Sequence, residues 1–213
     1  MSDDNQAAFM SALVTEHFVL QSAASTTVSE STGRASLYLA ALSSSLVATG
    51  FAAQSPHMFV PFVATLIPAL LILGFFTSVR LVDTGVQNLR YLAGIARIRE
   101  YYRELDPRAP YFFTEWGGGT RHDERAEVLA SLGTRRSRLL GLSTTASMVA
   151  AINSIVAGAG AVLVAVSISG REHTAFMVPL GVPAAVVCMT LFCRYQDSRY
   201  LALDFENNGK AEK

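Results

Sequence analysis

The residues that could bind a metal ion or act as general acids are scattered along this chain. It has four histidines, His17, His57, His122 and His173. They fall on both sides of the membrane that the uncharged segments described below predict, whereas a metal ion needs its ligands in one coordination sphere. We therefore expect no shared metal site and no cofactor.

The two cysteines, Cys188 and Cys193, are five positions apart in one predicted membrane helix. This arrangement is geometrically poor for a disulfide, and a zinc site would lack further ligands. We expect both cysteines to pack as small apolar side chains.

Acidic side chains are confined to the segments outside the uncharged stretches and to a turn at Glu172. Proton relays and ion-coupled sites within a membrane are usually built on ionisable side chains such as Asp or Glu. The lack of an intramembrane carboxylate argues against a secondary transporter or an intramembrane protease. No catalytic pair stands out, so we expect a protein that is not an enzyme.

The most notable polar residue within an uncharged stretch is Asn153, which Ser154 follows. One interpretation is a hydrogen bond between membrane helices, which contributes about 0.6 kcal/mol and at most about 2 kcal/mol. The other is a pore or constriction that Asn153 lines together with a group of hydroxyl side chains. The pattern favours the hydrogen bond and leaves the pore open. The hydroxyl residues are Ser43, Ser44, Ser45 and Thr49.

Helices that cross a membrane must position these residues. Of the 213 residues, 51% are hydrophobic and 16% are charged, and the formal net charge is zero. A helix rises 1.5 Å per residue and needs about 20 apolar residues to cross a hydrocarbon core of about 30 Å. Charged residues are absent from 35–79, 139–170 and 173–193. We therefore predict an all-α integral membrane protein with four transmembrane helices, at 35–53, 58–79, 139–169 and 174–193.

The four spans are predicted to form two hairpins, residues 35–79 and 139–193. The sequence Gln54-Ser-Pro-His57 makes the turn of the first hairpin. One span of each hairpin carries small residues at intervals of four, which allows helix backbones to approach closely. These residues are Ala41, Ser45, Thr49 and Ala53 in the first span, and Ala146, Ala150, Ser154 and Gly158 in the third.

The second span is predicted to continue out of the membrane as an amphipathic helix. Apolar residues recur at threes and fours up to Leu105, with arginines and glutamates in most of the gaps. Pro107 ends this helix. A capping-box pattern at Thr120 and Asp123 then opens a return helix that leads into the third span. Residues 80–138 are therefore predicted to form a cytoplasmic antiparallel helical stalk of the coiled-coil type.

A loop rich in aromatic residues and glycine connects the two stalk helices. Its aromatic side chains are predicted to cap the stalk or, alternatively, to form a docking surface for a partner. They are Tyr111, Phe112, Phe113 and Trp116. The three glycines before Thr120 lack the lysine and the preceding strand of a phosphate-binding loop, so we expect no nucleotide there.

The two ends of the chain are predicted to be cytoplasmic. Residues 1–34 begin with an amphipathic helix at 7–21, which attaches to the membrane surface or, as the pattern favours, packs against the stalk. The Ser/Thr-rich stretch at 22–32 is either a linker or a helix. Residues 194–213 form a short helix to Phe205, which Asn207-Asn-Gly209 ends, and a polar tail.

Arginine counts orient the chain. Eleven arginines lie between the second and third spans, four basic residues follow the fourth span, and the two short turns contain only Arg171. Cytoplasmic loops are enriched in Lys and Arg, so both termini and the stalk are predicted to lie inside, at the inner (plasma) membrane. Fifteen of the seventeen basic residues are arginine, which points to a bacterial source. Eight acidic residues accompany the eleven arginines, so no nucleic-acid partner is expected.

These features predict an interaction protein in the lipid bilayer. We expect a homo-oligomeric scaffold or a signalling or effector component, whose stalk and aromatic loop engage a cytosolic protein or another copy. The alternative is a regulated pore formed by several copies. In layout alone, with paired spans, helical cytoplasmic extensions and no enzyme domain, the chain resembles the small membrane effectors encoded beside soluble sensors in bacterial conflict systems.

Overall fold

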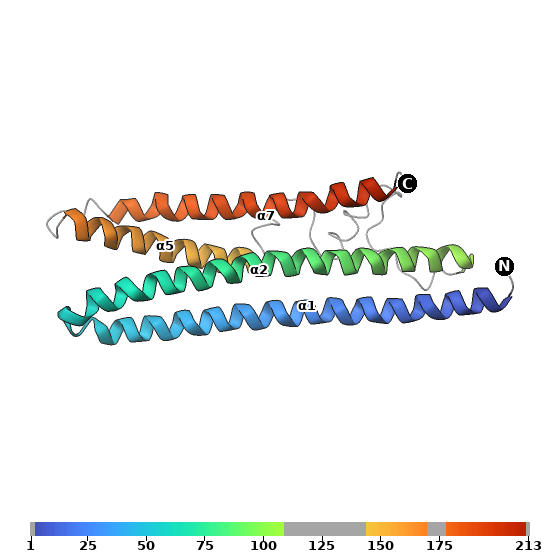
Figure 1. Ribbon diagram of the computed structural model, residues 1–213, viewed down its shortest axis with the longest axis horizontal. Helices are drawn as coiled ribbons and strands as arrows, with labels where there is room; N and C mark the ends of the chain where they lie inside the picture. Colours follow the sequence, from blue (N-terminus) through green and yellow to red (C-terminus); the bar gives the residue numbers. More distant parts are fainter. Residues whose placement is uncertain (1–2, 109–143, 170–177, 212–213) are drawn as a thin grey trace. The chain divides into compact units, whose positions relative to one another are not determined.

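The secondary structure in the described part of the protein is all helical, with short turns between the helices. The computed structural model describes residues 3–108, 144–169 and 178–211, and in these ranges it contains no strand. Four long helices and one short 3₁₀ helix follow one another along the chain (Figure 1). They are α1 (Asp3–Ala52), α2 (Pro56–Leu105), α5 (Thr145–Ser169), η3 (Val178–Leu180) and α7 (Gly181–Ala211). The predicted all-α class is confirmed.

Helix α1 is continuous, so the Ser/Thr-rich stretch at 22–32 is a helix and not a linker. Two of its hydroxyl groups bond to backbone carbonyls of the same helix. The Thr26 hydroxyl donates to the Ser22 carbonyl at 3.0 Å, and the Thr27 hydroxyl donates to the Ala24 carbonyl at 2.7 Å. Because these bonds satisfy the hydroxyls locally, the stretch can stay helical despite its composition.

Helix α2 begins at Pro56, after a tight turn, and ends at Leu105. A single helix therefore contains both the uncharged residues and the charged residues that follow, as predicted. Beyond its end, the Asp106 carboxylate accepts hydrogen bonds from the side chain and the backbone N–H of Arg108, at 2.7 Å for the latter. The side-chain bond and then the backbone bond lower the pKa of Asp106.

The predicted end of the C-terminal helix is wrong. Helix α7 continues through Asn207, Asn208 and Gly209 to Ala211. Asparagine and glycine are weak helix formers, but within an existing helix a glycine costs only about 1 kcal/mol relative to alanine. Residues that often end helices therefore do not have to end this one.

Among the described residues, three helices are long and apolar enough to cross a membrane: α1, α2 and α5. The fourth predicted span, 174–193, is described only from Val178 onward. From there the chain is helical and uncharged up to Arg194 of α7. Residues 139–143 of the third predicted span and 170–177 around the second turn lie outside the described residues.

The chain divides into two compact units. Among the described residues, the first comprises 3–30 and 84–108, and the second comprises 31–83, 144–169 and 178–211. We call them the polar unit and the apolar unit. Both α1 and α2 contribute one half to each.

In the polar unit, α1 and α2 run antiparallel. The rings of Phe9 and Tyr101 meet edge to face, with centroids 5.7 Å apart. The Thr27 hydroxyl lies 3.2 Å from the side-chain oxygen of Asn88. Val86, Ile95 and Ile98 of α2 are buried in this unit. The N-terminal helix therefore packs against the stalk helix, which is the arrangement that its sequence pattern favours.

The apolar unit is a bundle of four helical segments around a small core. The side chains of Tyr38, Val82 and Val149 are fully buried there. The complete cluster is Ala35, Tyr38, Leu81, Val82, Ala146 and Val149, with Leu39, Ile152, Phe192 and Tyr195 packed against it.

Large apolar side chains also cover the outside of the apolar unit. They include Leu46, Phe76, Ile155 and Leu191, which are each more than 60% exposed. A soluble protein rarely exposes apolar surface on this scale, whereas helices in a bilayer do so routinely.

Candidate functional site

Asn153 lies where three helices of the apolar unit meet. Its amide nitrogen, on α5, donates to the carbonyl of Leu71 on α2 at 3.4 Å. Its amide oxygen accepts from the hydroxyl of Tyr38 on α1, also at 3.4 Å. Both distances are long for hydrogen bonds, so each bond is at the weak end of the range. Gly74 leaves the space for the amide, because a Cβ at this position would overlap it.

This geometry corresponds to the interhelical hydrogen bond that the sequence predicts as one of two roles for Asn153. The partner residues, Tyr38 and Gly74, were not predicted from the sequence. A usable signal existed in Tyr38, because a tyrosine within a charge-free stretch needs a partner for its hydroxyl when it is buried.

The small residues of α5 lie on its buried face. Ala146, Ala150, Ser154 and Gly158 are all buried. The Ser154 hydroxyl donates to the Ala150 carbonyl at 2.7 Å, so it is satisfied within its own helix.

At Gly158 the backbones of α5 and α7 come close together. A Cβ at Gly158 would lie 2.5 Å from the carbonyl oxygen of Gly181, and a Cβ at Gly181 would lie 3.0 Å from the carbonyl oxygen of Gly158. Glycine at both positions therefore permits this approach.

Ser45 and Thr49, the candidates on α1, are half-buried. The Thr49 hydroxyl donates to the Ser45 carbonyl at 2.7 Å. Along α1 they lie seven and eleven residues beyond Tyr38, which is about 10 and 16 Å at the rise of a helix. Ser43 and Ser44 are exposed. The hydrogen bonds of Asn153 go to Tyr38 and Leu71 and not to these hydroxyls.

A second polar cluster, which was not predicted from the sequence, links α5 to α7. The Ser147 hydroxyl donates to the side-chain oxygen of Gln196 at 3.1 Å. Because the Ser147 hydroxyl proton is engaged in this bond, the Thr144 hydroxyl is the donor in the 2.9 Å hydrogen bond between Thr144 and Ser147. The Gln196 amide nitrogen in turn lies 3.5 Å from the Thr144 oxygen, which closes a ring of three side chains. Thr144 also caps α5 by accepting the backbone N–H of Ser147 at 3.2 Å.

An ion pair lies on the charged side of this cluster. The Arg199 guanidinium on α7 donates to the Asp83 carboxylate on α2 at 2.7 Å. The hydrogen bond, and then the charge, of Asp83 raise the pKa of Arg199. The pair ties α7 to α2.

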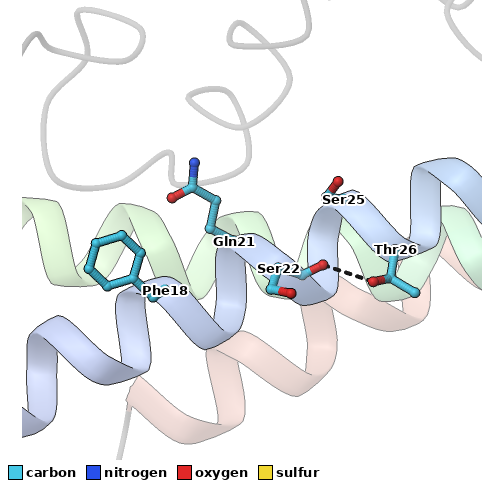
Figure 2. A pocket seen from close by; sticks show the side chains of 5 residues that line it. All are labelled: Phe18, Gln21, Ser22, Ser25 and Thr26. Atoms are coloured by element: carbon cyan, nitrogen blue, oxygen red, sulfur yellow. Dashed lines mark hydrogen bonds between the residues drawn. The ribbon is translucent and has the colours of Figure 1, made fainter.

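An open pocket lies on α1 in the polar unit. Figure 2 shows the side chains of Phe18, Gln21, Ser22, Ser25 and Thr26 around it. The Thr26 hydroxyl is bonded to the helix backbone. With one ring, one amide and three hydroxyls, the lining offers no acid, base or metal ligand.

The four aromatic candidates for partner binding, Tyr111, Phe112, Phe113 and Trp116, lie outside the described residues. Within the ranges that are described, no three His, Cys, Asp or Glu side chains lie close enough together to hold a metal ion. Cys188 and Cys193 are both free, and Cys188 is exposed, so the expectation that both cysteines pack inside the bundle is wrong for Cys188.

No protein-family model, curated protein or solved structure matches this chain.

The contact between α5 and α7 predicts that two neighbouring glycines respond differently to alanine. In Gly158→Ala the new methyl group meets a backbone oxygen that cannot move alone, so we expect a loss of about 1–3 kcal/mol of stability. In Gly160→Ala it meets only the Cγ2 atom of the Ile67 side chain, at 2.9 Å, and we expect a loss below about 1 kcal/mol. Unfolding of the purified proteins in mixed detergent micelles measures both. Equal stabilities would show that the two backbones do not meet at Gly158.

The three-helix junction predicts a measurable coupling between α1 and α5. In a double-mutant cycle of Tyr38→Phe and Asn153→Leu, we expect a coupling energy of about 0.6 kcal/mol, the usual value for a hydrogen bond between membrane helices. The same unfolding assay provides the four stabilities. Strict additivity would mean that the hydroxyl and the amide do not interact.

Proposed function

We propose that this protein is a non-enzymatic, multi-pass membrane protein that acts as an oligomeric scaffold or as a signalling or effector component. In this proposal residues 80–138 form a cytoplasmic helical hairpin that engages a cytosolic protein or another copy of the chain. The membrane is the inner (plasma) membrane, α7 supplies the fourth span, and both termini are cytoplasmic.

The observation that carries the proposal is the sharing of α1 and α2 between the two units. Each helix has one half in the apolar unit and one half in the polar unit. A change in tilt or rotation of such a helix within a membrane is passed on to its other half without a hinge. This coupling suits a protein that links a membrane event to a binding event in water.

The roles found for polar side chains in the apolar unit also support the proposal. The Asn153 amide, the Ser154 hydroxyl and the Gln196 amide are all engaged in contacts within or between helices. These contacts stabilise the packing of the helices in the apolar unit. We therefore expect the surface that recognises a partner to lie outside the apolar unit, and the aromatic loop of residues 107–120 is the leading candidate.

Partner recovery tests the proposal. Replacing Phe112, Phe113 and Trp116 together with serine removes most of the aromatic surface of the loop. We expect the variant to insert into membranes as the native chain does but to recover at least tenfold less of its partner, or of a differently tagged second copy, because buried aromatic residues dominate binding energies.

A matched control replaces Phe18 with serine, because this aromatic residue is exposed on α1 and does not lie in the loop. This control is expected to keep its partner. Unchanged recovery by the loop variant, or equal loss in the control, would contradict a role for the loop.

The alternative is a regulated pore formed by several copies. It is favoured by the exposed hydroxyls of Ser43 and Ser44 in the uncharged half of α1, which copies packed side by side would bring to a shared surface. One four-helix bundle is too slim to enclose a path, so a pore requires an oligomer. Release of a dye from liposomes, measured together with oligomeric mass, separates the two proposals, because only the pore predicts release.

A further inference from the structure

The helical segments of the apolar unit pass from uncharged to charged sequence at the same level of the bundle. The core cluster contains Ala35 of α1, Leu81 of α2 and Ala146 of α5, and Tyr195 of α7 packs against it. Ala35, Leu81 and Tyr195 each follow directly after an arginine in the sequence. Ala146 is the second residue of α5. The cluster therefore marks the level at which the chain passes from uncharged to charged sequence.

Three arginines lie at this level, one on each of three helices. They are Arg34 on α1, Arg80 on α2 and Arg194 on α7. Arg34 and Arg194 are exposed, and Arg80 is half-buried. Arg34 and Arg80 also interact within the chain. Arg194 has no carboxylate partner among the residues that the structure describes.

Exposed apolar side chains lie one turn away from each arginine, on the uncharged side. They are Leu37 beside Arg34, Phe76 beside Arg80 and Leu191 beside Arg194, and they are 73%, 66% and 61% exposed. A guanidinium one turn beyond an exposed apolar side chain is placed where lipid headgroups begin.

The net charge at this level is positive. Glu30, Asp83 and Asp197 are the carboxylates on these stretches of α1, α2 and α7, and Asp83 is already paired with Arg199. Four arginines are thus accompanied by three carboxylates. Guanidinium groups bind phosphate through two parallel hydrogen bonds, which favours a phosphate-bearing ligand over a simple counterion.

We propose that Arg34, Arg80 and Arg194 form a belt that binds the headgroups of anionic phospholipids at the cytoplasmic edge of the bundle. The proposal rests on the membrane placement of the apolar unit described above, and it adds a lipid class to it. Anionic lipid bound at the belt holds α1, α2 and α7 at a common depth.

Lipid retention by the purified full-length protein tests the belt. The protein in neutral detergent is titrated with phosphatidylglycerol or with phosphatidylcholine, and bound lipid is measured by native mass spectrometry. Each arginine near an anionic surface contributes about a fivefold preference. We therefore expect Arg194→Ala to lower phosphatidylglycerol affinity about fivefold and the triple alanine variant to lower it on the order of a hundredfold, with phosphatidylcholine unaffected.

Two matched variants control for charge and position. Arg194→Lys keeps the charge and should retain most of the preference. Arg97→Ala removes an exposed arginine of α2 that lies seventeen residues beyond Arg80, about 25 Å along the helix, and should change affinity less than twofold. Unfolding midpoints of all variants are compared with that of the native chain, so that a loss of lipid is not mistaken for a loss of fold.

Three results would overturn the proposal. The first is a triple variant that is stably folded and retains phosphatidylglycerol as the native chain does, and the second is an Arg97→Ala variant that loses as much lipid. The third is displacement of the lipid by an equal concentration of inorganic phosphate, which would assign the site to free phosphate. Release of the native chain from membranes by alkaline carbonate would instead refute the membrane placement, and the belt with it. Partner recovery is measured separately, so a failed belt leaves the scaffold proposal standing.

Discussion

Close contact between helix backbones is the constraint on which the apolar unit depends. In lipid the hydrophobic effect does not drive helices together, because lipid tails are as apolar as the side chains. Van der Waals contact must therefore hold membrane helices together. The contact is made where side chains are absent: Gly158 faces the carbonyl oxygen of Gly181, and Gly74 makes room for the Asn153 amide. Because the backbones approach there, weak hydrogen bonds such as those of Asn153 can form between helices. The polar groups thus specify how the helices pair, while the small residues allow them to meet.

A different force organises the polar unit, although the same two helices build it. In the aqueous surroundings that the proposal gives the polar unit, the burial of Val86, Ile95 and Ile98 and the contact of Phe9 with Tyr101 are favourable because they remove apolar surface from the solvent. Helices α1 and α2 therefore change their packing chemistry part-way along, near 30 and 84. These positions lie close to 34 and 80, where the charge pattern places the membrane edge. An unbroken helix with two such halves is the physical basis for proposing that membrane and cytoplasmic events are coupled.

Much of the fold could be predicted from patterns that act along a single helix. The apolar periodicity and Pro107 correctly predicted the end of α2 at Leu105, and the turn before Pro56 divided the long uncharged run. What the sequence did not predict depends on which helices become neighbours. The hydroxyl of Tyr38 needs a partner, but its partner and the role of Gln196 appear only when α5 lies beside α1 and α7. The sequence left the 22–32 stretch undecided between a linker and a helix, and it placed the end of the C-terminal helix too early. Helix propensity is a weak guide at both places because a long helix is already formed on one side.

The central claim is that four helices cross the membrane and that both ends and the stalk lie in the cytoplasm. Reporter fusions after Pro56, Gly118, Gly170 and Lys213 measure it directly, with one reporter active only in the cytoplasm and another active only outside. The account predicts cytoplasmic signals at Gly118 and Lys213 and external signals at Pro56 and Gly170. An external signal at Gly118 would reverse the orientation. Signals from the same side at Gly170 and Lys213 would show that α7 does not cross, and would contradict the four-span account.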